Sequence, residues 1–266
     1  MNNDSLAGLN VLVTRPAQQQ SAFISLLEQE GAQTTSLPCL AIVPLETDSA
    51  SRVKLQKVHE TDAVIFISTN AVQFAHTILP MPWSPRPQRI LAIGPTTATA
   101  LAERGMTVSV TPEPPYNSES LLSLPPVVDW LHRKQLQTIS LIKGQGGRPF
   151  LRNSLRKHGI TIDSIDVYRR MRPDIPDATL TRVFLNSPPD IVTITSDEAL
   201  TNLADLAGPR HQATLLKLPL VVNSERSAAL AHQLGFQSQI LVAPVPGDTG
   251  QLAAIKQWIR SYRHKL

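Results

Sequence analysis

Hydroxyl-bearing residues recur in this sequence where a short apolar run gives way to helical spacing. Serine, threonine and asparagine at such points can cap a helix, and capping explains each segment taken alone. Together with the free amides of a first helical turn, the same side chains can bind carboxylate or phosphate groups. The five segments therefore predict an anion-binding edge, and they are residues 14–16 (TRP), 68–70 (STN), 94–97 (GPTT), 195–197 (TSD) and 224–226 (SER).

A glycine-dense segment, residues 143–150 (KGQGGRPF), offers a second kind of anion site. Glycine lets backbone amides approach an anion closely, and Lys143 and Arg148 add positive charge. A tight turn that needs positive φ explains the glycines equally well. Neither GxGxxG nor GxxxxGK followed by Ser or Thr occurs, so a nucleotide-phosphate loop is not predicted.

Three further residue types bear on catalysis. Tyr168 stands beside Arg169 and Arg170, where a phenol could act as a weak acid, although packing in a strand also explains it. Cys39 has no base close by in sequence and is typical of a small apolar filler. The seven histidines show no HxxxH or HxxE spacing, and we expect most of them on polar helix faces or in loops. No metal site is predicted.

The composition excludes several classes of protein. The chain has 266 residues, of which 42% are apolar, 5% aromatic and 17% charged, as in an ordinary globular protein. A net charge of +4 is too weak to predict nucleic-acid binding. The single cysteine excludes an internal disulfide and fits a reducing cytoplasm. The first residues lack a signal-peptide pattern and no run approaches the ~18 apolar residues of a membrane span, so we expect a cytoplasmic protein.

The elements that must position these residues alternate between strand and helix. Residues 10–16 form an apolar run, residues 17–30 take up helical spacing, and Gly31 ends that helix. Gly105, Gly159 and Gly235 close three more amphipathic segments in the same way. This alternation predicts an α/β fold with parallel sheets. Two proline-rich stretches, residues 80–87 and 111–120, are expected to be connections.

The two halves of the sequence are similar to each other. Val11 and Gly31 align with Ile139 and Gly159 at an offset of 128 residues. At the same offset residues 62–72 lie over residues 190–200, and residues 91–105 lie over 221–235 at an offset that grows to 130. This repeat predicts two similar flavodoxin-like domains of about three βα units each, with a ligand cleft between them. Two further corresponding segments are expected to be extended connectors, and they are residues 37–45 and 165–173.

Taken in order, these segments resemble the uroporphyrinogen-III synthases over about residues 10 to 252. The resemblance rests on VLVTRP, DAVIFISTNAV, LAIGPTTATALAERG, SESLL, LIKGQGGRPFLRNSLRKHG with VYRR, and VVNSERSAALAHQLGF. It implies a lyase of tetrapyrrole (heme) biosynthesis that cyclises hydroxymethylbilane to uroporphyrinogen III, with inversion of the terminal pyrrole ring and loss of water. It further implies that no cofactor is needed, and we expect a monomer with this small-molecule substrate and no membrane or nucleic-acid partner.

The resemblance also implies an arrangement that the repeat alone leaves open. The first βα unit would be exchanged between the halves. Domain 1 would then hold residues 1–38 and 172–266, and domain 2 would hold residues 39–171 with both connectors.

Site residues are implied position by position. Tyr168 matches the family's tyrosine proposed to assist departure of the hydroxyl group, which makes it the expected catalytic residue. Two departures weaken the match, because Lys143 stands where relatives often have Arg and Asp197 replaces a small residue, which predicts a poorer anion site there. The expected substrate-binding residues are Thr14, Arg15, Ser68, Thr69, Asn70, Lys143, Gly144, Gly147, Ser196 and Ser224. The alternative function is a non-catalytic two-lobed binding protein for an anionic metabolite.

Overall fold

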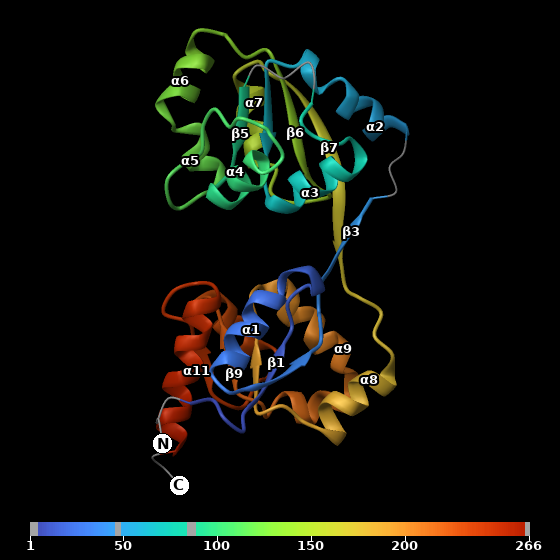
Figure 1. Ribbon diagram of the computed structural model, residues 1–266, viewed down its shortest axis with the longest axis vertical. Helices are drawn as coiled ribbons and strands as arrows, with labels where there is room; N and C mark the ends of the chain where they lie inside the picture. The colour runs from blue at the N-terminus through green and yellow to red at the C-terminus, as the bar shows by residue number, and fades with distance from the viewer. Residues whose placement is uncertain (1–4, 46–48, 84–88, 264–266) are drawn as a thin grey trace. The chain divides into compact units, whose positions relative to one another are not determined.

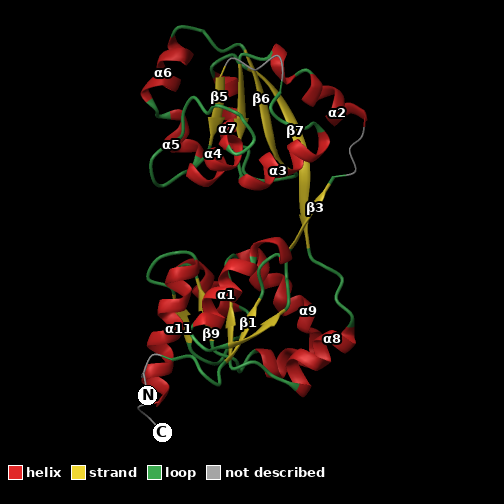
Figure 2. Ribbon diagram, viewed as in Figure 1, coloured by secondary structure: helices red, strands yellow, loops and turns green. Residues whose placement is uncertain are grey.

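The computed structural model describes residues 5–45, 49–83 and 89–263 (Figure 1). The chain divides into two compact units, with Met1–Ala41 and Met171–Leu266 in unit 1 and Ile42–Arg170 in unit 2. Each unit is built from one sheet with helices packed on it (Figure 2). The α/β fold class predicted from the sequence is confirmed. The exact domain boundaries expected above stay a prediction.

Unit 1 contains a five-stranded sheet in the order β10-β9-β8-β1-β2, whose strands pair in parallel. Successive side chains point to opposite faces, so Val11 and Val13 belong to one core and Leu12 to the other. The strands are β1 (Asn10–Val13), β2 (Gln33–Ser36), β8 (Ile191–Thr193), β9 (Leu220–Val222) and β10 (Ile240–Val242). On one face lie α1 (Ser21–Gln29) and α11 (Asp248–Arg263), and on the other lie α8 (Asp177–Thr181), α9 (Asp197–Leu215) and α10 (Glu225–Gln233).

Unit 2 contains a second five-stranded sheet, in the order β3-β7-β6-β4-β5. The strands are β3 (Ala41–Pro44), β4 (Ala63–Phe66), β5 (Arg89–Ala92), β6 (Thr138–Gly144) and β7 (Thr161–Met171). One face is covered by α2 (Ser49–Gln56), α3 (Thr69–Ile78) and α4 (Pro95–Ala102), and the other by α5 (Ser118–Leu122), α6 (Pro125–His132) and α7 (Phe150–Lys157). In the part of the chain described, no helix is both long and apolar enough to cross a membrane.

The pairing registers of the two sheets confirm the internal repeat. Val11 of β1 pairs with Ile191 of β8, and Ile139 of β6 pairs with Ala63 of β4, so an offset of 128 converts one pair into the other. The strand order in unit 1 is the flavodoxin-like one. In unit 2 the strands β7-β6-β4-β5 follow the order of β2-β1-β8-β9, with β6 in the place of β1, and β3 is an additional edge strand beside β7. The first βα unit therefore lies with the C-terminal strands, as the resemblance implied.

The same repeat relates the hydrogen bonds of two aspartates, each of which directly precedes a strand. The carboxylate of Asp190 accepts the amide N–H of Asn10 at 2.7 Å, and that of Asp62 accepts the amides of Gln137 and Thr138 at 2.8 and 2.9 Å. Burial by itself would raise the pKa of Asp62, but the hydrogen bonds from Gln137 and Thr138 outweigh it and hold the pKa below its ordinary value.

Replacing Asp62 by alanine is expected to lower the melting temperature of the protein at pH 7. A depressed carboxyl pKa stabilises the fold above the unfolded-state value of about 3.9 and loses that effect as pH falls through the folded-state pKa. The difference in melting temperature between wild type and Asp62→Ala should therefore shrink below about pH 4. Asp129→Ala, which breaks an exposed ion pair with Arg133, is the control. A difference for Asp62→Ala that does not change with pH would contradict the assignment.

Several elements differ from expectation. Each sheet has five strands, where about three βα units per half were expected, because β2 (QTTS) is polar and β10 has only three residues. The stretch 111–120 is not wholly a connection, since α5 begins at Ser118 and the Asn117 side chain accepts the amide of Ser120 at 2.8 Å. The expected connection 80–87 lies partly outside the described residues. The connectors are extended as predicted: residues 37–45 contain β3, and residues 165–173 contain the later part of β7.

Candidate active site

Three serines cap helices at the carboxyl ends of strands, as the capping interpretation predicts. Ser68, Ser196 and Ser224 precede α3, α9 and α10, and their hydroxyl oxygens accept the amides of Ala71, Ala199 and Ser227 at 3.0, 3.2 and 3.2 Å. All three serines are half-buried, so each hydroxyl lies beside the free amides of a first helical turn. Of the other predicted residues on α3, Thr69 is exposed and Asn70 is half-buried.

Tyr168 lies inside unit 2 in contact with two other predicted residues. It is 3% exposed, its ring stacks on Phe74 with centroids 5.6 Å apart, and its hydroxyl is 3.1 Å from the Ser68 hydroxyl. The register of β6 shifts between Lys143 and Gly144, which pairs Gly144 with Tyr168. A Cβ on Gly144 would lie 2.5 Å from two ring atoms of Tyr168. The structure thus joins Tyr168, Ser68 and Gly144 in one contact.

The glycine segment forms a turn in which Lys143 donates hydrogen bonds to the turn's own backbone. Lys143 Nζ donates to the carbonyl oxygens of Gly144 and Gly146 at 2.8 and 2.9 Å and pairs with Asp166 at 2.8 Å. The turn's own carbonyl groups thus accept two of the three ammonium hydrogens, and Asp166 balances the charge. Gly146 and Gly147 have φ of 78° and 83°, so the tight-turn alternative accounts for both glycines.

Arg148, the other cation of the segment, also has an internal partner. It pairs with Glu119 at 2.5 Å, and this hydrogen bond is the main reason that the pKa of Glu119 lies below its ordinary value. Both cations of the glycine segment are therefore paired with a carboxylate.

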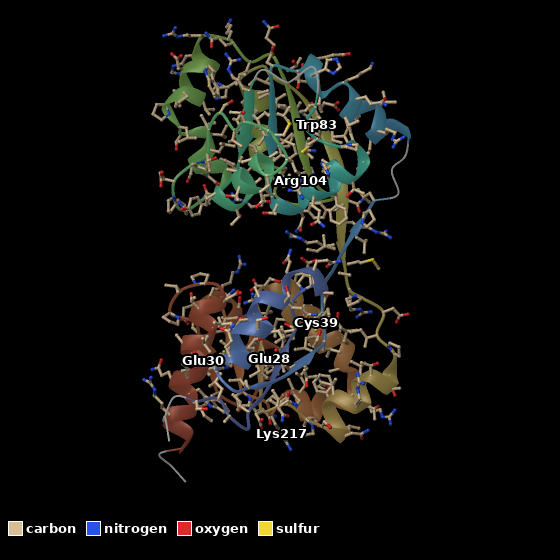
Figure 3. All side chains as sticks on the ribbon, in the orientation of Figure 1. Glu28, Glu30, Cys39, Trp83, Arg104 and Lys217 are labelled. Atoms are coloured by element: carbon tan, nitrogen blue, oxygen red, sulfur yellow. The ribbon has the colours of Figure 1, made fainter. Side chains whose placement is uncertain are left out.

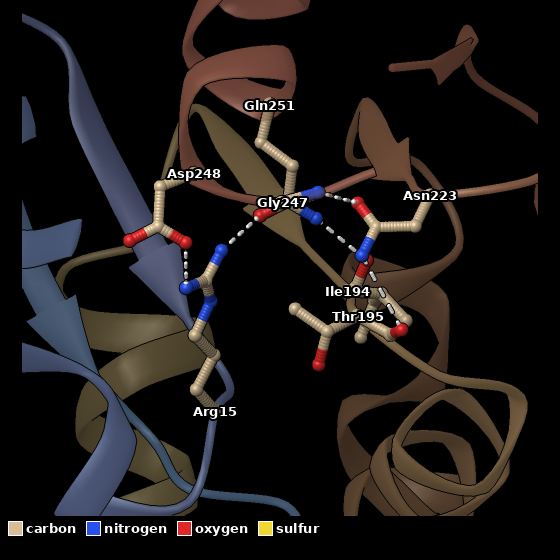
Figure 4. Close-up of polar contacts among 7 residues, drawn as sticks. All are labelled: Arg15, Ile194, Thr195, Asn223, Gly247, Asp248 and Gln251. Carbon is tan, nitrogen blue, oxygen red and sulfur yellow. Dashed lines mark hydrogen bonds and ion pairs between the residues drawn. The ribbon is translucent and has the colours of Figure 1, made fainter. Parts of the chain in front are cut away.

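Arg15 is the centre of a polar network in unit 1 (Figure 4). Its guanidinium donates to the carboxylate of Asp248 and to the Gln251 side chain, the latter at 3.0 Å. Gln251 in turn donates to the carbonyl of Ile194 at 2.7 Å, which joins α11 to the end of β8. Asn223 donates to the carbonyl of Thr195 at 3.4 Å. The network therefore links the ends of β1, β8 and β9.

Two further residues near the strand ends, Thr14 and Asp197, have side chains that bond to other protein groups. Thr14 is fully buried and its hydroxyl donates to the carbonyl of Thr193 at 2.7 Å. Asp197 accepts the hydroxyl of Ser227 at 2.6 Å and pairs with Arg226 Nε at 2.7 Å. The Asp197 carboxylate thus contacts the start of α10.

Cys39 and His211 are both buried in unit 1. Cys39, labelled in Figure 3, is buried as expected, and burial raises the pKa of its thiol above the ordinary value. His211 does not follow the expectation for histidines, because it is 1% exposed, stacks on Phe184 and lies 3.1 Å from Asp177. No group of three or more potential metal ligands occurs among the described residues.

Sequence reasoning missed Asp248, Gln251 and Asn223. A glycine followed by an acidic residue at a helix start, as in Gly247-Asp248, is a signal for a capped helix but not for a partner of Arg15. Arg15 and Asp248 are separated by most of the chain, so only the fold brings them together.

Comparisons with known proteins agree over nearly the whole chain. The family model described as "Uroporphyrinogen-III synthase HemD" matches residues 21–252. The uroporphyrinogen-III synthase of Salmonella typhimurium is 30% identical over 93% of this chain and 100% of its own length, and that of Escherichia coli is 29% identical with the same coverage.

Solved structures show the same fold. A mutant uroporphyrinogen III synthase from Thermus thermophilus matches with a TM-score of 0.58 at 16% identity, over 97% of this chain and 100% of that one. The uroporphyrinogen-III synthetase of Helicobacter pylori also has a TM-score of 0.58, at 15% identity, over 94% of this chain and 99% of that one.

Proposed function

This chain belongs to the uroporphyrinogen-III synthase family, and we propose on that basis how its own residues carry out the family's reaction. It cyclises hydroxymethylbilane to uroporphyrinogen III, with inversion of the terminal pyrrole ring and loss of water, in tetrapyrrole (heme) biosynthesis. The observation that carries this function is a family match spanning residues 21–252 together with relatives matched over their full length. Since those relatives are named as enzymes, nothing favours the alternative of a non-catalytic binding protein.

The main task of the protein is to control conformation. Loss of the terminal hydroxyl leaves an azafulvene, which the last pyrrole ring attacks, and an unassisted chain closes without inversion. A protein that holds the chain in one reactive shape therefore selects the inverted product. The substrate carries acetate and propionate side chains, which are suited to hydroxyl and amide donors.

We propose that the helix starts at strand ends bind these carboxylates. The proposed groups are the hydroxyls of Ser196 and Ser224, the first-turn residues Thr69 and Asn70, and the backbone of Gly147. The Thr14 hydroxyl is buried and bonded to the carbonyl of Thr193, and Lys143 is bonded to its own turn, so we propose that both act by holding the strand ends in shape.

For hydroxyl departure we propose a two-step proton path. The Ser68 hydroxyl gives its proton to the leaving hydroxyl of the substrate, which departs as water, and takes the phenolic proton of Tyr168. The phenolate regains a proton by the same path from the proton that the substrate releases on ring closure. Support comes from the 3.1 Å separation of the two oxygens and from the greater exposure of Ser68 compared with buried Tyr168. The amides at the start of α3 stabilise negative charge as it develops on this pair.

The decisive experiment supplies freshly generated hydroxymethylbilane to the purified protein. The products are oxidised and the uroporphyrin isomers separated by chromatography. We expect the type III isomer to dominate. Only the symmetric type I isomer, as in a reaction without protein, would overturn the proposed function.

Single replacements of Ser196 or Ser224 by alanine are expected to reduce activity only a few-fold. Each removes one helix cap, which costs about 1 kcal/mol of stability, and one of many distributed donors. Steady-state kinetics and thermal melting measure the two effects. Complete loss of activity in either variant, with the fold retained, would contradict a shared set of contacts.

We also propose that the protein acts as a monomer in the cytoplasm. The buried free thiol of Cys39 is in keeping with a reducing compartment. Sedimentation analysis of the purified protein measures the oligomeric state.

A further inference from the structure

The guanidinium of Arg15 is buried, and its contacts with Phe23 and Gln251 hold it in place. The Arg15 side chain is 9% exposed and stacks on the Phe23 ring at 4.2 Å. Gln251, which accepts from Arg15 at 3.0 Å, is itself fully buried and tied to the carbonyl of Ile194 at 2.7 Å (Figure 4). These contacts fix the position of the guanidinium without neutralising its charge.

Asp248 supplies the charge that neutralises Arg15, and it is the more exposed partner of this ion pair. Its side chain is 34% exposed and lies in the first turn of α11, directly after Gly247, whose φ is 111°. Arg15 Nε is buried and has no hydrogen-bond partner among the described residues. A guanidinium binds a carboxylate through two of its N–H groups, so this site is built for a carboxylate that reaches solvent.

We propose that Asp248 is a resident carboxylate that a carboxylate of the substrate replaces on Arg15. The inference rests on the proposed function, because the acetate arms of hydroxymethylbilane carry the same CH₂–COO⁻ group as an aspartate side chain. Exchange of one carboxylate for another keeps the buried Arg15 paired throughout. Removal of Asp248 without replacement would leave that buried charge uncompensated, which is strongly unfavourable.

The other strand-end cations lack this combination of features. Lys143 already donates to two backbone carbonyl groups and is paired with Asp166. The side chains of Arg148 and Arg226 are 71% and 83% exposed, so their ion pairs are surface pairs that bind an anion weakly. Arg15 alone in this group combines burial, a fixed guanidinium and a partly exposed carboxylate.

The first test asks whether removal of the Asp248 carboxylate creates a binding site for a free carboxylate. Melting temperatures of wild type and Asp248→Ala are compared in sodium acetate and in sodium chloride of equal ionic strength and pH. We expect acetate to raise the melting temperature of Asp248→Ala by several degrees more than chloride, with no such difference for wild type. The control is Asp163→Ala, which removes the carboxylate from Lys54, whose side chain is 43% exposed, and should show no preference for acetate. Equal effects of the two salts on Asp248→Ala would overturn the proposal.

The second test uses the substrate and the conservative variant Asp248→Asn, which keeps the side-chain shape and removes the competing charge. We expect the KM for hydroxymethylbilane to fall at least threefold while the type III product is retained. A KM equal to or above that of wild type, in a folded variant, would overturn the exchange. Failure of the proposed function is seen separately, because wild type would then give only the type I isomer.

Discussion

Tyr168→Phe is expected to slow formation of the type III isomer by about 10²-fold, the lower end of what a positioned proton donor contributes. The phenolic oxygen lies 3.1 Å from Ser68 Oγ, so the variant removes the proton that the proposed path uses and little else. The ring keeps its packing against Phe74, and the lost hydrogen bond costs about 1 kcal/mol of stability. Unchanged turnover in Tyr168→Phe would remove the residue from the mechanism.

The internal repeat provides a matched control for this experiment. Ser68 and Ser196 are equivalent at the 128-residue offset, and each caps a helix with a similar hydrogen bond, at 3.0 and 3.2 Å. Of these two hydroxyls, that of Ser68 lies within hydrogen-bond distance of Tyr168. We therefore expect Ser68→Ala to reduce activity nearly as much as Tyr168→Phe. Ser196→Ala should lose a similar amount of stability and only a small part of the activity.

Gly144→Ala is expected to reduce type III formation to a similar degree. The added Cβ would lie 2.5 Å from Cε2 and Cζ of Tyr168, and the ring is packed too tightly to yield without moving its hydroxyl. Overpacking of this kind costs about 1–3 kcal/mol of stability. Isomer analysis and thermal melting measure the two losses.

Gly146→Ala in the same turn separates this clash from backbone strain. Gly146 has a φ of 78° and nothing within 4 Å of an added Cβ, so alanine there brings strain on the order of 1 kcal/mol and no clash. Its activity should stay close to that of wild type. If Gly144→Ala were as active as Gly146→Ala, close contact of residue 144 with Tyr168 would not matter for the reaction.

Local patterns explain why so much of the fold could be predicted. Gly31, Gly105, Gly159 and Gly235 all have positive φ, since a residue without Cβ ends a helix in the left-handed conformation at least cost. The serine caps follow from hydrogen bonds between residues three apart. The parallel sheets follow from fully apolar runs such as β4, which is buried on both faces.

The elements that were missed lack such local signals. Strand β2 is polar because it lies at the edge of its sheet, and its pairing with β1 determines its conformation. Helix α5 has only five residues and depends on its Asn117 cap. Patterns of apolar residues do not report elements of these kinds.

Sequence alone determined the α/β class, the duplication, the exchange implied by the family resemblance, and the recurrence of hydroxyl groups at strand ends. These depend on the spacing of residues that are neighbours in the chain or related by a fixed offset. Tertiary structure alone decided that Tyr168 meets Ser68 and Gly144, and that Arg15 meets Asp248 and Gln251. Contacts between residues so far apart in sequence form only when packed sheets and helices bring their ends together, and a one-dimensional pattern does not contain that geometry.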